Sequence, residues 1–363
     1  MEKIELIINR KEYSDHAVER ATIEELKDGE VLMEVERFSF TSNNITYAII
    51  GDMIGYWKFF KAEEGKGKLP GWGFAKVISS KSDALSEGER FYGYYPMGSH
   101  LIVEPAKVNE FGFLDGAEHR RPLPPIYNYY TNTKNDAVYA QETEDIQCLL
   151  RPLFTTSFLI DDQFADNDFY GSEQIILTSA SSKTGLALAH LLKKRKTAGA
   201  ASFDIVGLTS PSNKDFVIAS GYYDSVITYD EYANITKEKA SSIVDFSGNH
   251  KLQYDLQVHL GESLKYNCLV GVVHWEDLRG QEKLPQKGTF FFAPTNAQKR
   301  QQDWGREGFQ QRLKDAWNGF IPETKDWMSI ETYEGAEKLS DIYSKMLSGD
   351  FDPKIGYIIK PTV

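Results

Sequence analysis

The stretch that decides the fold is Glu173–Leu192, which reads EQIILTSASSKTGLALAHLL. An apolar, β-rich run is followed by small hydroxyl residues and then by the apolar spacing of a helix. The stretch therefore predicts a strand over Glu173–Thr178, a tight turn, and a helix over Ser182–Lys196. In parallel sheets such a turn leads into a helix N-terminus, whose N–H groups and dipole attract the phosphates of a nucleotide.

The alternation of strands and helices continues on the C-terminal side of this stretch, and a helix over Asp145–Phe164 precedes it. Further strands are predicted over Asp204–Thr209, Ser225–Thr228, Ser241–Phe246 and Asn267–His274, with helices over Asn213–Ser220 and Lys251–Leu260. These strands are nearly continuous in apolar residues, which is typical of a parallel sheet covered by helices on both faces. The sequence therefore predicts an α/β domain.

The chain before Glu110 has a different pattern. Short β-like segments separated by Gly and Pro predict a compact β-barrel or sandwich, with one helix over Ile45–Phe60. The expected strands are Glu2–Asn9, Val31–Phe40, Gly73–Ser80, Arg90–Tyr95 and Leu101–Val103. Residues 110–143 are rich in Pro, Tyr and Asn and predict a long ordered loop or insertion, which is more often functional than idle.

Composition restricts the class of protein. The chain has 363 residues, of which 41% are hydrophobic, so it can bury large cores in two domains. The net charge of −12 argues against binding to nucleic acid or to an anionic membrane surface. Cys148 and Cys268 lie in apolar surroundings and fit a reduced compartment. With neither a signal peptide nor an apolar run long enough to span a bilayer, we expect a cytoplasmic protein.

The order of elements and several motifs resemble the medium-chain dehydrogenase/reductase superfamily, on its zinc-free quinone oxidoreductase-like side. The motifs are TSASSKTG (Thr178–Gly185), SGYYDSVITYDEY (Ser220–Tyr232), SSIVDFSGN (Ser241–Asn249) and the closing helix and strand of Glu334–Ile359. Within that superfamily, the wording NNITYA, GYYPMGSHLIV and VGLTSPSN is similar to a family of unknown function. The resemblance implies a GroES-like β-barrel catalytic domain over 1–143 and 319–363, with the insertion 110–143. It also implies a Rossmann-type dinucleotide-binding domain over 144–318.

The turn after the first strand of that domain departs from the glycine-rich fingerprint. Ser179, Ser182 and Lys183 stand where glycines are usual, and only Gly185 occupies a fingerprint glycine position. Serine hydroxyls can donate to phosphates and Lys183 adds a positive charge. The alternative is a plain strand–helix connection with an N-cap at Ser181 or Ser182. The candidate cofactor-binding residues of the turn are Ser179, Ala180, Ser181, Ser182, Lys183, Thr184 and Gly185.

The end of the second strand predicts which dinucleotide binds. An NAD site has an acid there for the ribose 2′-OH, but no acid occurs between Gly207 and Lys214. Ser210, Asn213 and Lys214 can surround a 2′-phosphate as donors and a cation, directly after Thr209. We therefore expect NADP(H), the alternative being an exposed polar loop capped at Ser212.

Three residues outside these two loops are expected to contact the cofactor as well. The resemblance implies Thr156 beside the nicotinamide and Gly248 after the fourth strand. His274 ends the fifth predicted strand, at the edge where ligands bind parallel sheets. The alternatives are helix packing for Thr156 and a structural role for His274.

Catalytic groups are expected in Phe40–Tyr47, the segment that faces the nicotinamide in the resembling reductases. Asn44 takes the position of the family's Asp, and Tyr47 that of its aromatic residue. A tyrosine can donate a proton to a developing enolate. The alternative is that these polar residues cap the helix that follows.

Substrate contacts are expected from the insertion, where Arg120, Tyr127 and Tyr130 could bind or line a small molecule. Solvation of a charged loop is the alternative for Arg120. The cysteines of zinc-carrying relatives are missing from Phe40–Tyr47, and the histidines form no metal-binding motif, so no metal is expected.

Two functions remain open at this point. The first is a zinc-independent, NADPH-dependent reductase of a quinone or an α,β-unsaturated carbonyl compound. The second is a non-catalytic nucleotide-binding or scaffold protein that retains the fold. The aromatic strand Phe290–Phe292 suggests a homodimer paired through strand edges.

Overall fold

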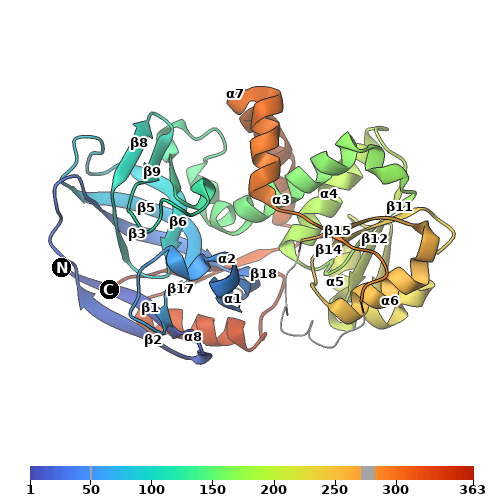
Figure 1. Cartoon of the computed structure of the whole chain (residues 1–363), viewed down its shortest axis with the longest axis horizontal. Helices are drawn as coiled ribbons and strands as arrows, with labels where there is room; N and C mark the ends of the chain where they lie inside the picture. Colours follow the sequence, from blue (N-terminus) through green and yellow to red (C-terminus); the bar gives the residue numbers. More distant parts are fainter. Residues whose placement is uncertain (50, 271–282) are drawn as a thin grey trace. The chain divides into compact units, whose positions relative to one another are not determined.

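The computed structural model describes residues 1–49, 51–270 and 283–363. The chain divides into two compact units (Figure 1). Unit 1 comprises Met1–Pro152 and Met328–Val363, and unit 2 comprises Leu153–Trp327.

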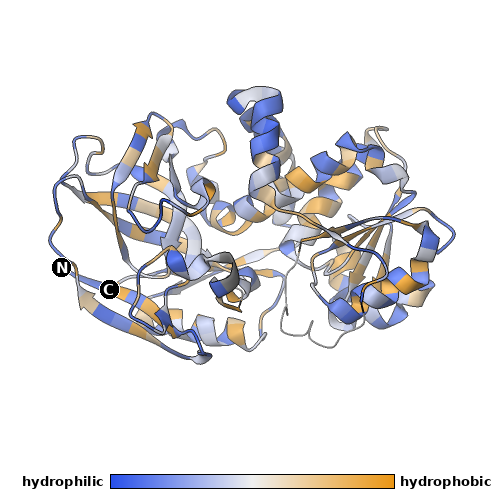
Figure 2. Cartoon of the chain, viewed as in Figure 1, coloured by the Kyte–Doolittle hydropathy of each residue, from blue (hydrophilic) through white to orange (hydrophobic). Residues whose placement is uncertain are grey.

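Unit 2 is built on a parallel sheet. Its strands are β11 (Gln174–Leu177), β12 (Asp204–Thr209), β13 (Ser225–Thr228), β14 (Ser241–Asp245), β15 (Leu264–Leu269) and β16 (Thr289–Phe290). They lie in the order β13-β12-β11-β14-β15-β16, and each neighbouring pair is parallel. The central strands β11 and β14 are buried along their whole length, as expected for a parallel sheet covered on both faces, and the inner strands are largely apolar (Figure 2). From β11 the chain moves to β12 and β13 on one side and then to β14 on the other, so a topological switch point lies between β11 and β14.

Helices follow these strands as the sequence predicts. Their bounds are α3 (Glu144–Asp166), which begins in unit 1, η5 (Asp168–Gly171), α4 (Lys183–Thr197), η6 (Pro211–Asn213), α5 (Lys214–Ala219), η7 (Tyr229–Asn234), α6 (His250–Leu260), η8 (Gly261–Ser263) and α7 (Ala293–Thr324). Helix α4 carries a run of buried residues, Leu186–Leu192, that covers the sheet. This burial fixes the N-terminus of α4 at the carboxyl end of β11.

Unit 1 is mainly antiparallel. Its strands are β1 (Glu2–Asn9), β2 (Glu12–Thr22), β3 (Val31–Phe40), β4 (Lys66–Gly67), β5 (Pro70–Ser80), β6 (Arg90–Pro96), β7 (His100–Val103), β8 (Pro105–Asn109), β9 (Gly112–Asp115), β10 (Tyr129–Asn132), β17 (Ser329–Glu334) and β18 (Ile355–Lys360). Its helices are α1 (Ser42–Ile49), α2 (Gly51–Ile54), η1 (Tyr56–Lys58), η2 (Pro125–Tyr127), η3 (Thr133–Asn135), η4 (Gln141–Thr143) and α8 (Ala336–Leu347). One sheet has the order β2-β1-β4, and the other runs β17-β18-β3-β5-β6-β10-β9-β8, with β7 paired to β3.

The C-terminal tail completes unit 1. Strand β18 pairs antiparallel with β3, where Tyr357 lies opposite Phe40. Helix α8 packs against the β1–β2 hairpin, and the Tyr343 hydroxyl donates to the Tyr13 carbonyl at 2.8 Å. The tail therefore supplies both a strand and a helix to the N-terminal core.

Two local predictions differ from the structure. The expected helix over Ile45–Phe60 is divided into α1, α2 and η1, and Gly55 adopts the left-handed region with φ 80°. The expected loop over 110–143 contains β9 and β10, and β10 pairs with β6. The Phe113 and Tyr130 rings stack with centroids 5.0 Å apart and are fully buried. Because burial removes the backbone of β9 and β10 from water, the strand pairing is what satisfies their N–H and C=O groups.

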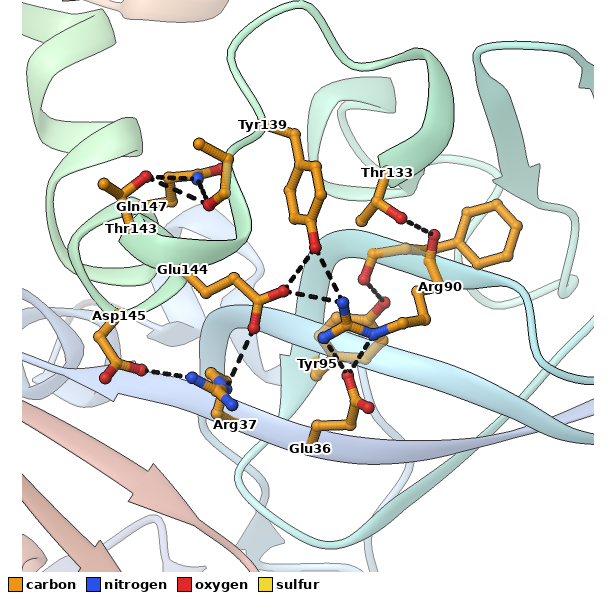
Figure 3. Close-up of polar contacts among 12 residues, drawn as sticks. Glu36, Arg37, Arg90, Tyr95, Thr133, Tyr139, Thr143, Glu144, Asp145 and Gln147 are labelled. Atoms are coloured by element: carbon orange, nitrogen blue, oxygen red, sulfur yellow. Dashed lines mark hydrogen bonds and ion pairs between the residues drawn. The ribbon is translucent and has the colours of Figure 1, made fainter.

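A network of charged side chains holds the start of α3 against β3 and β6 (Figure 3). Glu144 accepts hydrogen bonds from Arg90 at 2.8 Å and from Tyr139 at 2.7 Å, and Arg90 also donates to Glu36 at 2.6 Å. Arg37 donates to Asp145 at 2.8 Å. Burial acts against ionisation of Glu144, but these donors lower its pKa below the ordinary value.

Candidate functional site

The turn between β11 and α4 is closed tightly around its serines. Ser179 adopts the left-handed region with φ 51°, a conformation that favours glycine and is found at a position where the fingerprint has one. Gly185 leaves little room for a side chain, since a Cβ would lie 3.0 Å from both the Ser179 carbonyl oxygen and the Ser182 hydroxyl. The backbone thus keeps the conformation of a glycine-rich turn with serine in place of glycine.

Ser182 is the N-cap of α4, and its hydroxyl oxygen accepts from the Gly185 N–H at 3.0 Å. A capping hydroxyl keeps its own proton, so Ser182 can still donate to an anion. Lys183 and Thr184 occupy the first turn of α4, the end of the helix at which the helix dipole favours negative charge. Ser157, next to Thr156 on α3, donates to the Thr184 carbonyl at 2.9 Å, which ties α3 to this turn.

Both backbone polar groups of Ala180 are hydrogen-bonded within unit 2. Its N–H donates to the Leu208 carbonyl at 2.9 Å, and its own carbonyl accepts from the Tyr223 hydroxyl at 2.9 Å. Ala180 therefore positions the turn over β12.

The turn meets the loop after β12. The Asn213 amide donates to the Ser181 hydroxyl at 3.2 Å, so two predicted cofactor residues are brought together. Ser210 lies in the same loop, with its hydroxyl 3.0 Å from that of Ser212. The Thr209 hydroxyl, at the end of β12, is buried and has no hydrogen-bond partner within the described residues.

Lys214 is engaged by an acid that sequence reasoning missed. Its Nζ donates to Glu231 Oε2 at 2.9 Å, and this carboxylate also accepts from the Thr228 hydroxyl at 2.9 Å. Hydrogen bonds from Lys214 and Thr228 lower the pKa of Glu231 to about 2. Glu231 lies in η7, directly after β13. The sequence pattern of NAD sites looks for an acid after the second strand, here β12, and therefore does not identify Glu231.

A second missed residue is Asp245, at the carboxyl end of β14. It accepts from the Thr178 hydroxyl at 2.5 Å and the Ser247 hydroxyl at 2.7 Å. Burial raises the pKa of Asp245, against these hydrogen bonds. Thr178 accepts in turn from the Phe246 and Ser247 N–H groups, which holds the loop carrying Gly248, with φ 60°, against the turn between β11 and α4. The sequence signal that could have identified Asp245 is an acid at the end of an apolar, buried strand.

The residues at this edge of the sheet fit a dinucleotide. The turn keeps the close approach that a pyrophosphate needs, and it offers hydroxyl and helix N-terminal donors. The buried Thr209 hydroxyl lacks a partner that a ligand could supply. These features lie around the switch point between β11 and β14, where parallel sheets bind ligands.

Unit 1 gathers aromatic side chains around Tyr47, here called the tyrosine cluster: Tyr47, Tyr56, Phe59, Trp72, Tyr94 and Tyr127. The Tyr47 ring lies 4.3 Å from that of Tyr56, and the Tyr56 and Tyr127 hydroxyls are 2.9 Å apart. The predicted residues Tyr47 and Tyr127 are thus brought into one cluster. Trp72 and Tyr94 were missed, although each belongs to an aromatic-rich run, and they face each other as cross-strand partners on β5 and β6.

The Tyr47 hydroxyl accepts from the Asn43 amide at 2.6 Å, which leaves its own proton available for donation. Burial, followed by the neighbouring Tyr127, raises the pKa of Tyr47 well above its ordinary value of 10.0. Tyr47 therefore stays protonated at neutral pH.

The Asn44 side chain forms hydrogen bonds around the start of α1. Its side-chain oxygen accepts from the Thr41 N–H at 2.7 Å and the Thr41 hydroxyl at 3.1 Å, and its amide donates to the Pro70 carbonyl at 2.8 Å. This arrangement is the capping alternative raised above. It gives no support to a catalytic Asn44.

Arg120 and Tyr130 lie inside unit 1. Arg120 is 1% exposed and donates to Asp115, Asn128 and Tyr130, and to the carbonyl of Tyr127. The Tyr130 hydroxyl donates in turn to the Tyr94 carbonyl at 2.9 Å. These contacts hold the 110–143 segment together and give no support to a substrate role for either residue, because their polar groups are already engaged.

His274 lies outside the described residues, so its role stays a prediction. Edge strand β16 leaves the Phe290 side chain 54% exposed, and the homodimer likewise stays a prediction. Within residues 1–49, 51–270 and 283–363, no set of acids, histidines and cysteines is arranged to hold a metal ion. In the same ranges no helix has the length and apolar character required to cross a bilayer.

The fold is that of medium-chain dehydrogenases/reductases. CurA from Vibrio vulnificus in complex with NADPH is similar with a TM-score of 0.60 at 11% identity, over 99% of each chain. An enoyl thioester reductase (a mutant form) from Candida tropicalis gives 0.57 at 12% identity, over 99% of this chain and 100% of the other. An alcohol dehydrogenase from Thermotoga maritima gives 0.57 at 8% identity, over 100% of each chain. The predicted Rossmann-type and GroES-like fold class is confirmed.

The family is more specific than the fold. Residues 38–352 match the model described as "Protein of unknown function (DUF2855)", and the chain belongs to this family. No curated protein matches its sequence. The predicted resemblance to a family of unknown function within this fold is therefore confirmed.

Proposed function

We propose that this protein is an NADP(H)-dependent, zinc-independent reductase that acts on a quinone or an α,β-unsaturated carbonyl compound. The observation that carries the proposal is the turn Thr178–Gly185. It keeps a left-handed residue, a capped helix N-terminus and a glycine that two oxygen atoms approach closely, at the switch point of a parallel sheet.

The cofactor assignment combines this turn with the loop after β12. Ser181, Ser182 and the first turn of α4 would hold the pyrophosphate, and Ser210, Asn213 and Lys214 would surround the 2′-phosphate. Thr156, Gly248 and His274 remain expected contacts. The similar CurA structure contains NADPH, which supports the same choice of dinucleotide here. When bound, NADPH supplies the hydride.

Tyr47 is the proposed proton donor. Its hydroxyl receives a hydrogen bond from Asn43, so its own proton can pass to an enolate oxygen. The surrounding tyrosine cluster suits a flat, conjugated substrate, since aromatic rings stack on such molecules. The similar enoyl thioester reductase supports the reduction of a conjugated double bond.

The test has two stages. Calorimetric titration with NADPH and with NADH measures binding, and a panel of enones and quinones is then assayed by the loss of NADPH absorbance. We expect NADPH binding followed by oxidation with at least one member of the panel. If neither dinucleotide binds, the proposal fails.

A second function is favoured by a specific observation. Asn44 and Arg120, both expected at the active site, have their polar groups engaged by structural contacts. A protein that binds NADPH without catalysis would retain the turn and lose such groups. NADPH binding without turnover of any enone or quinone would support this alternative.

A further inference from the structure

We infer that Glu231 sets the preference between the two nicotinamide dinucleotides by competing with a 2′-phosphate for Lys214. The inference rests on the proposed function, because it assumes that a dinucleotide occupies the edge of the parallel sheet in unit 2. It goes beyond that proposal by naming the group that opposes NADP(H).

The position of Glu231 follows from the strand register. Thr209, the last residue of β12, lies opposite Thr228, the last residue of β13. In doubly wound folds the adenosine ribose lies at the end of the second strand, here β12. The Thr209 hydroxyl is buried and has no partner in the part of the chain that the structure describes, which leaves an unsatisfied hydroxyl at the strand end where the ribose is expected.

Glu231 is held one strand away from this position. Thr228 and Glu231 form a capping box at the start of η7, in which the carboxylate accepts from the Thr228 hydroxyl at 2.9 Å and its N–H at 3.3 Å. The same oxygen accepts from Lys214 Nζ at 2.9 Å. With its pKa lowered to about 2, Glu231 is ionised at neutral pH.

The two ribose groups interact differently with this pair. A 2′-phosphate attracts Lys214 but is repelled by Glu231, and it must draw Lys214 away from the carboxylate. A 2′-OH can donate to a carboxylate, as it does in NAD sites. Both side chains are partly exposed, at 35% and 42%, so they can rearrange when a ligand binds. Glu231 therefore weakens NADPH binding and supports NADH binding.

The experiment uses the full chain and isolates the 2′ group. Calorimetry measures the dissociation constants of adenosine 2′,5′-bisphosphate and 5′-AMP for wild type, Glu231→Gln and Lys214→Met. For Glu231→Gln we expect roughly fivefold tighter binding of the bisphosphate, an effect typical of a partly exposed ion pair, with 5′-AMP unchanged or weaker. For Lys214→Met we expect weaker binding of the bisphosphate.

The double variant tests whether the two residues act as a pair. If Glu231 acts by occupying Lys214, Glu231→Gln should give a smaller gain in the Lys214→Met background. Gln at position 231 can still accept from Thr228 in the capping box, so the variant should fold.

Asp255→Asn is the matched control, because it also removes one acid from a lysine pair, Lys251–Asp255 on α6. It should leave both constants unchanged. The inference is overturned if wild type binds both probes and Glu231→Gln changes the ratio of their two dissociation constants no more than Asp255→Asn does. If wild type binds neither probe nor NADPH, the proposed function itself fails, and this inference fails with it.

Discussion

Ser179 and Gly185 show how the turn after β11 forms with a single fingerprint glycine. Ser179 takes the left-handed backbone that glycine normally supplies, at a cost of roughly 1–2 kcal/mol for a residue with a Cβ. Gly185 is needed for a different reason, namely the close approach of the Ser179 carbonyl and the Ser182 hydroxyl. Conformational freedom and space are separate requirements, and at Gly185 it is the limited space that favours glycine.

We expect Gly185→Ala to lower the free energy of unfolding by about 1 kcal/mol, because the added methyl group meets two oxygen atoms. NADPH binding should weaken as the turn opens. Urea denaturation and calorimetry measure the two effects. Gly319→Ala in α7 is the control, since nothing lies within 4 Å of its added Cβ. Helix propensity should then raise stability by up to about 1 kcal/mol. Equal effects of the two substitutions would contradict the packing argument.

The hydroxyl of Tyr47 gives a second test at the residue scale. Tyr47→Phe should lower the rate of NADPH oxidation by a factor on the order of 100 and leave NADPH binding unchanged. Because burial raises the pKa of Tyr47, its acid form persists as pH rises, so no loss of rate from this group is expected between pH 6 and 10. Initial rates across this range provide the measurement.

Tyr95→Phe is the matched control for Tyr47→Phe. Tyr95 is also fully buried in unit 1, and its hydroxyl donates to the Phe91 carbonyl at 2.9 Å, outside the tyrosine cluster. Its loss should affect stability and not rate. If both variants reduce the substrate at the wild-type rate, Tyr47 is not the proton donor.

Elements that have a strong periodic signal were predicted well. Strands β1, β3, β12 and β13 have the predicted bounds, because apolar runs ended by turn residues mark them locally. Strands β9 and β10 were not predicted, since they form by pairing with each other across a loop and, for β10, with β6 farther away in the chain. The Pro- and Tyr-rich composition of 110–143 carries no signal of that partner.

The start of α3 depends on Glu144, which gives a prediction at the scale of elements. Glu144→Gln should lower the free energy of unfolding by about 2 kcal/mol at pH 7, since Arg90 loses its more buried anionic partner and keeps only Glu36. The pKa of Glu144 is lowered in the folded state, so its contribution is present above the unfolded value of 4.5 and is lost as pH falls below it. The difference between variant and wild type should therefore shrink below pH 4.

Urea denaturation at pH 7 and at pH 3.5 measures this difference. Glu142→Gln, an exposed residue of η4, is the control and should change stability little at either pH. A difference between wild type and Glu144→Gln that stays constant with pH would show that the carboxylate charge is not what stabilises α3.

At the scale of the whole molecule, the proposed cofactor should protect three separate segments of unit 2. NADPH at a hundredfold excess over its dissociation constant stabilises the bound state by about 2.7 kcal/mol, which slows amide exchange roughly 100-fold where opening requires release. We expect protection over 178–185, 209–214 and 245–249. Hydrogen-exchange mass spectrometry measures it, with the edge strand β2 as an internal reference. Protection absent from all three segments would contradict the assigned site.

The sequence by itself determined the fold class, the succession of strands and helices along the α/β part of the chain, and the turn after the first of these strands. These features depend on local periodicity and on short-range turn chemistry, which are written in consecutive residues. Only the tertiary structure decided that Glu231 pairs with Lys214, that Asp245 bonds Thr178, and that Arg120 is buried against Asp115. Each depends on which distant side chains share a buried or charged environment, and no spacing in the chain encodes that environment.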